Sequence, residues 1–369
     1  MMFGSESMRT FGGKIVDIMQ KNNLTCKESK EMFRQVLSNE QPDLQSGAFL
    51  AALASKGETK NEIIGCFEAI YNFDTVKVTP SVTPLVENCG TGMDEIKTFN
   101  ISTAASIVAA ANGIYMAKHG ARAISSTCGA IDILESVGID VKCDLEIVKK
   151  SIERAGIGIF NGTSFDVHPK LDRILSQIRF GTTLNIAASL ANPASPKYGV
   201  RGVYSNDLVE PVARIMGRIG YRRAIVFHGL NRDGKRGIDE ISSMGKTIVA
   251  ELARGEIIVY TITPEDVGIE RTDEKELFPA LNREEEVLRF LRTLSGEEMA
   301  RCDIVCLNTA PILYMMGKAS NIKGGFDMAK ETIESGRAIA KLKEWVREQN
   351  SDPKSGEENL DFLLERATA

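Results

Sequence analysis

The chain lacks the features that would direct it to a membrane, to the secretory route or to nucleic acid. No apolar run approaches the roughly 20 residues of a membrane-spanning helix, and the opening MMFGSESMRTFGG has neither the basic start nor the apolar core of a secretory signal. Basic residues are not in excess, because the net charge is -5 and the pI is near 5.6. We therefore expect a cytoplasmic protein that binds no membrane and has no general attraction for nucleic acid.

Paired cysteines and clustered histidines are also missing. The seven cysteines are scattered without a paired spacing, which favours reduced thiols over a disulfide framework. The three histidines, His119, His168 and His228, stand in separate motifs and do not suggest a metal triad or a hydrolase. We interpret His228, in VFHGL, as structural.

Helical patterns dominate the first part of the chain, where residues 14 to 75 show short amphipathic helices. Two of them begin with S/T-x-x-E capping boxes, Thr25 with Glu28 and Thr59 with Glu62. A third helix opens at Pro42-Asp43. These signals predict a small helical domain.

The pattern changes at about residue 81, where short β-rich runs begin to alternate with helices. Three of the later runs are RAIVFHG, GEIIVYTI and DIVCLNTA. Such alternation is typical of a largely parallel sheet covered by helices, and 43% hydrophobic residues in a chain of 369 can fill a substantial core.

We therefore predict an α/β protein with a small N-terminal helical domain and a large α/β domain built on a mainly parallel central sheet. The predicted parts are a tail over 1–12, a helical domain over 13–80 with a contribution from about 175–205, the α/β domain over 81–345, and a linker with a C-terminal helix over 346–369. The polar stretch REQNSDPKSGEEN would form that linker.

The stretch ENCGTGMDEIKTFNIST, residues 87–103, has the composition of an anion-binding loop. Gly90 and Gly92 allow backbone N–H groups to approach a ligand, and a helix beginning near Ser102 would direct its unsatisfied N–H groups to the same place. Polar side chains that could bond phosphate oxygens or hold a divalent cation follow at Thr98, Asn100, Ser102 and Thr103. Taken alone, a plain strand-turn-helix connection explains this stretch equally well.

A second stretch of this kind, KHGARAISSTCGAIDILESVG, follows about one helix later. Lys118 supplies a positive charge unless it is an ordinary solvated lysine, and Gly120 permits close approach of the backbone. Ser125, Ser126 and Gly129 make a hydroxyl-bearing turn that leads into a helix. Two anion loops indicate a large phosphorylated substrate.

Neighbouring carboxylates, Asp239 and Glu240, occur in GKRGIDEIS after the strand-like AIVFHG. On an exposed helix such a pair is commonplace and binds no metal. Beside two phosphate loops it favours Mg²⁺, which typically uses a few carboxylates together with substrate oxygens and water.

In order and spacing, GTGMD, KTFNIST, KHG, SSTCG with IDILESVG, and GIDE resemble the motifs of the anthranilate phosphoribosyltransferase family, and the likeness covers nearly the whole chain. The resemblance implies the two-domain fold shared with the nucleoside phosphorylases, with phosphoribosyl pyrophosphate and Mg²⁺ held between the domains and a homodimer formed through the helical domain. It implies transfer of the phosphoribosyl group to an aromatic amine, with release of pyrophosphate through a transition state of oxocarbenium character.

The resemblance, together with the two loops, gives individual residues their expected roles. Phosphoribosyl pyrophosphate would be bound by Gly90, Thr91, Gly92, Asp94, Thr98, Asn100, Ser102, Thr103, Lys118, Gly120, Ser125, Ser126 and Gly129. The catalytic residues would be Lys118, Asp239 and Glu240, and the Mg²⁺ ligands would be Ser102, Asp239 and Glu240. The acceptor would contact Gly90, His119 and Arg179.

The chain departs from the family pattern mainly where the acceptor binds. Lys-His-Gly-Asn-Arg is the commonest form of the second motif, and its asparagine, which helps to bind anthranilate, is Ala121 here. Met93 replaces a glycine of the first loop, Thr127 and Ala130 replace a basic residue and a serine, and TTLNIAASLANP lacks the family's arginine and Gly-Pro. We therefore expect a phosphoribosyltransferase that uses anthranilate or a related acceptor.

Other functions stay open on the sequence alone. A different nitrogen nucleophile could be the acceptor. A nucleoside phosphorylase-like enzyme would carry a Lys-His-Ser-type motif, where this chain has Lys118-His119-Gly120. A non-catalytic relative that binds nucleic acid could use the small basic loop LNRDGKRG, against the acidic pI.

Overall fold

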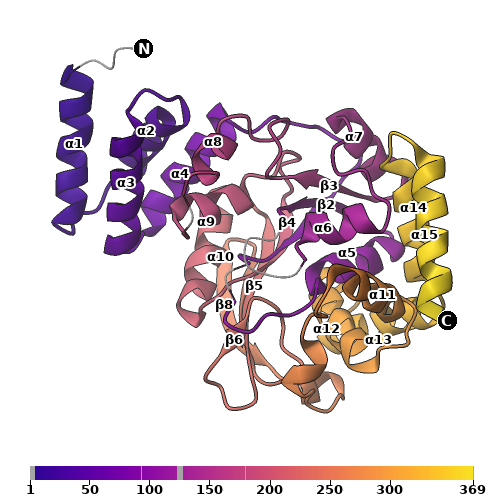
Figure 1. Ribbon diagram of the computed structural model, residues 1–369. Helices are drawn as coiled ribbons and strands as arrows, with labels where there is room; N and C mark the ends of the chain where they lie inside the picture. Colours follow the sequence, from indigo (N-terminus) through magenta and orange to yellow (C-terminus); the bar gives the residue numbers. More distant parts are fainter. Residues whose placement is uncertain (1–4, 93, 123–127, 179, 369) are drawn as a thin grey trace. The chain divides into compact units, whose positions relative to one another are not determined.

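The computed structural model describes residues 5–92, 94–122, 128–178 and 180–368, which are coloured along the chain in Figure 1. The chain divides into two compact units. The helical unit comprises Met1–Lys77 and Gly162–Ser195, and the α/β unit comprises Val78–Asn161 and Pro196–Ala369. None of the helices in the described ranges is long and apolar enough to cross a membrane.

The helical unit is built from helices that share one apolar core. They are α1 Ser5–Met19, α2 Cys26–Leu37, α3 Asp43–Lys56, α4 Lys60–Phe73, α8 Leu171–Leu175 and α9 Thr183–Leu190. Both predicted capping boxes are formed, at Thr25 with Glu28 and at Thr59 with Glu62, and α3 starts after Pro42 as expected. Satisfying the first N–H groups of α2 and α4 fixes where these helices begin.

Two predicted boundaries of the helical unit are wrong. The expected tail over 1–12 is largely helical because α1 begins at Ser5 and buries Phe11, whose ring meets that of Phe49 edge to face with centroids 5.6 Å apart. The returning segment is Gly162–Ser195 rather than about 175–205: α8 belongs to it as well, and residues from Tyr198 onward join the central sheet of the other unit.

Eight strands form one sheet within the described part of the α/β unit. They are β1 Leu85–Cys89, β2 Tyr115–Gly120, β3 Ile157–Asn161, β4 Tyr198–Gly202, β5 Arg223–Leu230, β6 Gly237–Ile238, β7 Thr247–Ala253 and β8 Glu256–Ile262. The order is β3-β2-β1-β4-β5-β7-β8, with β6 paired to β5. The first five strands in this order are parallel, and β6, β7 and β8 are joined in antiparallel pairs. The predicted α/β class with a mainly parallel sheet is confirmed.

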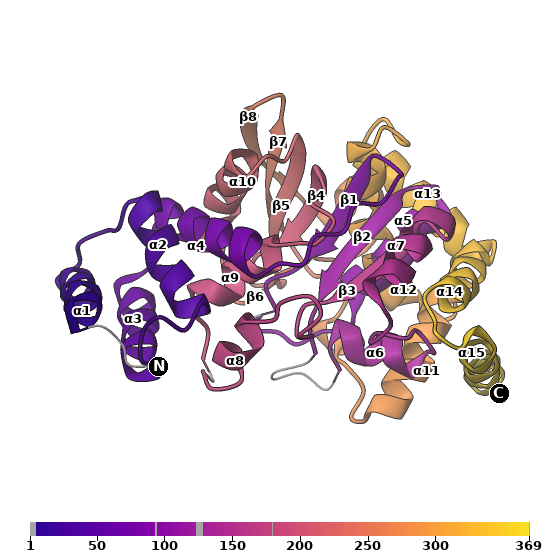
Figure 2. The ribbon, with the colours of Figure 1, turned by 90° about the horizontal axis from the view of Figure 1, so that it is seen from above.

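Helices cover this sheet. They are α5 Ile101–Ala111, α6 Ala130–Ser136, α7 Leu145–Arg154, α10 Val209–Arg218, α11 Arg283–Leu294, α12 Met299–Met315, α13 Ile322–Glu334, α14 Arg337–Glu348 and α15 Pro353–Thr368, with short 3-10 turns at Asn206–Leu208, Pro264–Val267 and Glu274–Leu277. The helix α5 connects β1 to β2, and α10 connects β4 to β5. Because the crossover from β1 to β2 and the crossover from β4 to β5 run in opposite directions along the sheet, these two helices lie on opposite faces, as Figure 2 shows.

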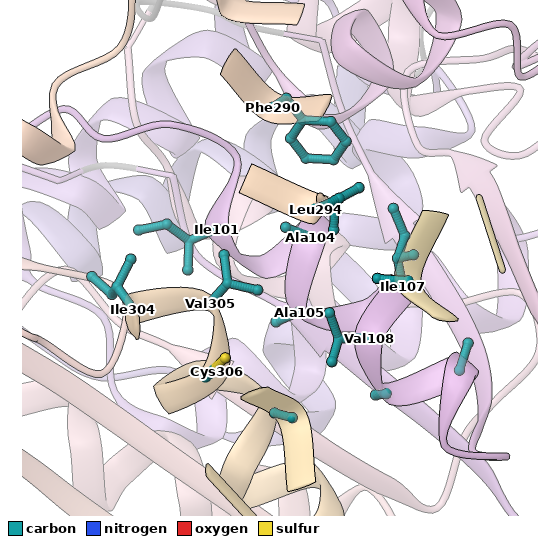
Figure 3. Close-up of a cluster of buried hydrophobic side chains, with 14 of the residues drawn as sticks. Ile101, Ala104, Ala105, Ile107, Val108, Phe290, Leu294, Ile304, Val305 and Cys306 are labelled. Atoms are coloured by element: carbon teal, nitrogen blue, oxygen red, sulfur yellow. The ribbon is translucent and has the colours of Figure 1, made fainter. Parts of the chain in front are cut away.

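The core of the α/β unit surrounds α5. Figure 3 shows apolar side chains of α5, among them Ile101, Ile107 and Val108, against Phe290 of α11 and Val305 of α12. In α5 every residue from 101 to 110 except Ser102 is buried. Such complete burial holds α5 rigidly, so that its first turn, which carries the predicted anion site, has a fixed position.

Two further predictions in this unit are wrong. The run DIVCLNTA is part of α12 and not a strand, because most residues of this helix are buried, so that its apolar residues show no clear helical periodicity. The polar REQNSDPKSGEEN is mostly helical, since α14 continues to Glu348 and α15 starts at Pro353. Proline favours the first position of a helix, which explains the early start of α15.

Candidate active site

The predicted site residues follow strands whose carboxyl ends meet at one edge of the sheet. Gly90 follows β1, Gly120 ends β2, and Gly202 ends the neighbouring β4. After β5 the chain turns back through β6, which leaves Asp239 and Glu240 beside these strand ends. Open α/β sheets place their ligand sites along this edge, so the topology itself gathers the site.

Three glycines make room for the acid pair. A Cβ atom on Gly90 would lie 2.8 Å from Cγ of Asp239, and one on Gly202 would lie 3.0 Å from Cα of Asp239 and overlap its carbonyl oxygen. A Cβ atom on Gly229 would overlap the carbonyl oxygen of Glu240. Any side chain at these positions would therefore displace the acidic segment.

The sequence analysis did not identify Gly202 and Gly229, and it explained Gly90 only by the approach of a ligand. Their one signal is a glycine near the end of a buried strand, in VRGVY and FHGL. Gly92 is a glycine for a different reason: its φ of 71° lies in the left-handed region, and a Cβ atom there would meet open space.

Hydrogen bonds join the acid pair to the first anion loop and to α5. The Gly92 N–H donates to Oδ2 of Asp239 over 2.7 Å, and the Thr91 hydroxyl donates to the same oxygen over 3.4 Å. The Ser102 N–H, in the first turn of α5, donates to Oε1 of Glu240 over 3.2 Å. The structure thus brings the predicted anion-binding stretch 87–103 together with the acid pair, which lies 147 residues after Gly92 and 138 residues after Ser102.

Acidic side chains gather in this part of the unit. Asp94 accepts the Asp239 N–H over 3.1 Å, so three carboxyl groups are crowded together. Burial raises the pKa of Glu240 well above its usual value, and the charge of Asp239 adds to this rise. Burial also raises the pKa of Asp94, and the charges of Asp239 and Glu240 raise it further. Such crowding of acids favours a cation.

The donor set suits Mg²⁺ that is shared with a ligand. No group of three or more His, Cys, Asp and Glu side chains in the described ranges is arranged to hold a metal ion by itself. The carboxylates of Asp239 and Glu240 are hard oxygen donors, and Ser102, whose N–H bonds to Glu240, carries a hydroxyl group that is a donor of the same kind. Mg²⁺ commonly takes one or two carboxylates and completes its shell with phosphate oxygens and water, so these residues fit it.

Lys118 lies next to the first turn of α5, and its ammonium group donates three hydrogen bonds. Its Nζ donates to the carbonyl oxygen of Asn88 over 2.9 Å, to Oγ of Ser106 over 3.2 Å and to the carbonyl oxygen of Ser102 over 3.4 Å. The side chain is buried, and this burial lowers its pKa. The structure therefore shows Lys118 fastening the end of β1 to the first turn of α5, and its expected contact with phosphate stays a prediction.

Asn88 supports the candidate site, and the sequence analysis did not identify it. Its Nδ2 donates to the carbonyl oxygen of Ser102 over 2.9 Å and to Oγ of Ser106 over 3.2 Å, so it orients the same helical turn. Next to it, the buried Glu87 accepts hydrogen bonds from Arg201 over 2.9 Å and from Tyr221 over 2.7 Å, which ties β1 to β4. The available signal was the polar Glu-Asn pair inside the strand LVENC.

The remaining predicted residues are divided between the site and the core. Asn100 precedes α5 at the N-cap position without a side-chain capping bond, and its Nδ2 donates to the carbonyl oxygen of Cys128 over 3.1 Å, which connects the two anion loops. Gly129 caps α6 and donates its N–H to Oδ2 of Asp132 over 3.0 Å. Thr98 is partly exposed, whereas Thr103 is fully buried and its hydroxyl has no hydrogen-bond partner.

The second predicted loop is only partly described. His119 is buried, and a Cβ atom on Gly120 would come within 3.3 Å of the Cβ atom of Ala130, so close packing contributes to this glycine. Ser125, Ser126 and Arg179 lie outside the described residues, as do Met93 and Thr127. His228, expected to be structural, is buried with its Nδ1 2.8 Å from the carbonyl oxygen of Val203.

The chain is similar to known proteins both in its domain organisation and in its sequence. The helical bundle domain of a glycosyl transferase family matches residues 15–73, and the a/b domain of that glycosyl transferase family matches residues 82–339. These matches define the class, a two-domain glycosyl transferase. The helical unit and the motif-bearing sheet described above correspond to its two parts.

Relatives narrow the class to one family. The anthranilate phosphoribosyltransferase of Methanococcoides burtonii is 37% identical over 343 residues, which are 92% of this chain and 93% of the relative. That of Acetivibrio thermocellus is 36% identical over 340 residues, 91% of this chain and 96% of the relative. The chain belongs to the anthranilate phosphoribosyltransferase family, as its motifs predicted, and it is an enzyme of the pentosyltransferase class.

Solved structures agree with this placement. The crystal structure of anthranilate phosphoribosyltransferase from Thermus thermophilus has a TM-score of 0.82 at 31% identity and covers 91% of this chain and 98% of that chain. The Saccharomyces cerevisiae enzyme, solved in complex with PRPP and Mg, shares the fold with a TM-score of 0.81 at 21% identity and covers 95% of this chain and 99% of that chain.

Proposed function

We propose that this protein transfers the phosphoribosyl group from phosphoribosyl pyrophosphate to an aromatic amine, anthranilate or a related acceptor, in a reaction that requires Mg²⁺ and releases pyrophosphate. One observation carries the proposal: the N–H groups of Gly92 and Ser102, which suit phosphate, lie one hydrogen bond from carboxylates that suit Mg²⁺. The names of the relatives and the yeast complex with PRPP and Mg support it.

The diphosphate end of the donor would be held by backbone and hydroxyl groups of the first loop and of α5. Further contacts would come from the predicted set Gly90, Thr91, Asp94, Thr98, Asn100, Thr103, Gly120, Ser125, Ser126 and Gly129. Thr103 could take part only after a local rearrangement, because its side chain is fully buried. The fixed first turn of α5 favours this use, since a preorganised N–H group costs little to orient.

Ser102, Asp239 and Glu240 would hold Mg²⁺ together with oxygens of the diphosphate. Bound there, the cation supplies positive charge to a leaving group that gains negative charge as it departs. Lys118 adds a second positive charge from its fixed place next to the Ser102 carbonyl, which is 3.4 Å from its Nζ. Through that bond Lys118 also keeps Ser102 in position.

The reaction would form a bond from the amine nitrogen to the anomeric carbon of ribose while the bond from that carbon to pyrophosphate breaks. An arylamine is weakly basic and loses its proton after attack, so orientation matters more than a strong general base. Gly90, His119 and Arg179 would contact the acceptor, as the family pattern implies. Ala121 is exposed and would leave one contact to anthranilate unmade.

The test mixes purified protein, Mg²⁺ and phosphoribosyl pyrophosphate with a panel of aromatic amines that includes anthranilate, and follows pyrophosphate release. We expect release that depends on one of these amines and on Mg²⁺. The same protein with inorganic phosphate and pyrimidine nucleosides should release no free base. Phosphorolysis of a nucleoside without amine-dependent release would replace this function with that of a phosphorylase.

We also propose a homodimer formed through the helical unit and a cytoplasmic location. Exposed apolar side chains support the dimer: Val16 and Met19 in α1 and Leu44 in α3, of which Leu44 is 89% exposed. None of the seven cysteines forms a disulfide bond, which supports a reducing compartment. Analytical ultracentrifugation of the protein and of a Met19→Ser, Leu44→Ser variant tests the dimer, and a monomeric wild-type protein would refute it.

A further inference from the structure

The residue that follows the acid pair, Ile241, pairs its backbone with a side chain from a distant helix. Ile241 is fully buried and lies between β6, which ends at Ile238, and β7, which begins at Thr247. Buried N–H and C=O groups outside a strand or helix need other partners. Asn308 of α12 supplies both, because its Oδ1 accepts the Ile241 N–H over 2.8 Å and its Nδ2 donates to the Ile241 carbonyl oxygen over 2.9 Å.

The side chain of Asn308 is itself held in one orientation. It is buried at 1% exposure, and its Nδ2 also donates to the carbonyl oxygen of Ile304, one turn earlier in α12, over 2.9 Å. A rotation of the amide by 180° would turn its NH₂ group toward the Ile241 N–H, so only one orientation satisfies all three backbone groups. Asn308 therefore fixes the direction of the Ile241 backbone as well as its place.

The bond from the Ile241 N–H to Asn308 acts on the peptide group between Glu240 and Ile241. The oxygen of that peptide group is the Glu240 carbonyl, which packs so closely against Gly229 that a Cβ atom there would overlap it. Both β5 and α12 thus hold this one peptide group. Because it follows the Cα atom of Glu240 directly, its orientation determines where the acidic side chain begins.

The helix that carries Asn308 also contacts α5. The neighbouring Thr309 donates from Oγ1 to the carbonyl oxygen of Ala105 in α5 over 3.4 Å. One turn from the start of α12, the guanidinium group of Arg301 lies over the ring of Phe99, which comes just before α5, with 4.4 Å from Cζ to the ring centroid. The helix α12 thereby connects the two elements that carry the proposed Mg²⁺ ligands, the acidic segment and the first turn of α5.

We infer that Asn308 is a positioning residue of the candidate site, which holds the acid pair in its place relative to the first turn of α5. This inference rests on the proposed function and adds a residue that acts through the Ile241 backbone. Without the side-chain amide, two buried backbone groups lose their partners and the acidic segment moves to find others. A displacement of about 1 Å at a reacting centre can lower the rate by about a hundredfold.

Asn112 supplies a matched control in the same unit. Its Nδ2 donates to the carbonyl oxygen of Val108, four residues earlier in α5, over 2.8 Å, as that of Asn308 does to Ile304 in α12. It also donates to Oγ1 of Thr332 in α13 over 2.8 Å, so Asn112 joins two elements as well. Asn112 caps the carboxyl end of α5, whereas the candidate site lies at the other end. Asn112→Ala thus removes the same side chain away from the acid pair.

The first measurement is hydrogen exchange, followed by mass spectrometry of peptides that contain Ile241, and it needs no turnover. Asn308→Ala should speed the exchange of the Ile241 amide at least about tenfold, because it removes the acceptor of that N–H. Asn112→Ala should leave this exchange as it is in the wild-type protein. Thermal unfolding of both variants measures how much stability each substitution removes.

The second measurement is the rate of amine-dependent pyrophosphate release. Asn308→Ala should lose about two orders of magnitude in kcat and require more Mg²⁺ for half of its maximal rate, while KM for the amine stays within about twofold. Asn112→Ala should keep kcat within about twofold of wild type, even where its loss of thermal stability is equal. A purely structural role of Asn308 would not separate the two variants in this way.

Three results would overturn the inference: unchanged exchange of the Ile241 amide in Asn308→Ala, a kcat that falls no further than in Asn112→Ala, or a loss of activity that lies only in KM for the amine. If Asn308→Ala does not fold, Asn308→Leu fills the space without polar atoms and must still lower kcat more than Asn112→Leu. Wild-type protein that releases no pyrophosphate with any amine would refute the proposed function, and the exchange of the Ile241 amide tests the contact of Asn308 independently of it.

Discussion

Gly202→Ala should disturb the candidate site, although Gly202 lies in β4, a strand that carries none of the proposed Mg²⁺ ligands. The added methyl group would overlap the carbonyl oxygen of Asp239 and lie 3.0 Å from its Cα atom, so the acidic segment must move away from β4. Overpacking of a buried position typically costs about 1 to 3 kcal/mol, which a stable domain survives. A displacement of about 1 Å at a reacting centre can lower the rate by about a hundredfold.

We therefore expect Gly202→Ala to fold, to lose about 1 to 3 kcal/mol of unfolding free energy in urea, and to lose about two orders of magnitude in kcat/KM for the proposed reaction. Gly47→Ala in α3 is the matched control, because a Cβ atom there meets nothing within 4 Å and alanine favours a helix by about 1 kcal/mol. A Gly202→Ala protein with normal turnover and normal binding of Mg²⁺ and pyrophosphate would refute the packing argument.

Other substitutions test other parts of the site. Asp239→Asn with Glu240→Gln should abolish turnover and leave the far-ultraviolet circular dichroism unchanged, and unchanged activity would contradict the metal assignment. Ala121→Asn should raise kcat/KM for anthranilate, because it restores the contact that the family pattern contains, and no gain would indicate a differently shaped acceptor pocket. Arg201→Met should cost about 3 to 5 kcal/mol in urea unfolding, since it removes the cation from a buried carboxylate, whereas adding Glu87→Gln should recover part of the loss.

Local signals in the sequence were sufficient for much of the fold. A capping box such as Thr59 with Glu62 involves residues three positions apart, so its chemistry can be recognised without knowledge of the tertiary structure. The alternation that predicts a parallel sheet is likewise local. It failed for α12, because a helix that is buried along most of its length lacks a clear polar face and therefore resembles a buried strand.

The sequence was sufficient to predict the motifs of the candidate site. It was not sufficient to predict the residues that hold these motifs in place. The Gly-Thr-Gly loop, the start of α5 and the pair Asp239-Glu240 indicate their chemistry by residue type. By contrast, position 202 requires glycine because the carbonyl oxygen of Asp239, from a different part of the sequence, packs against it. Asn88 contributes through its hydrogen bond to the carbonyl oxygen of Ser102, which lies 14 residues later. Such dependence on distant neighbours appears only when the chain is folded.

Shared coordination of Mg²⁺ by the protein and by the diphosphate has a thermodynamic consequence. Linkage requires that the factor by which Mg²⁺ tightens pyrophosphate binding equals the factor by which pyrophosphate tightens Mg²⁺ binding. Mg²⁺ alone should bind weakly, because no described group of three acidic, histidine or cysteine side chains forms a closed metal site. Glu240→Ala removes one proposed ligand of the shared cation and should therefore lower this common factor, and calorimetry that finds the factor unchanged would contradict the ligand assignment.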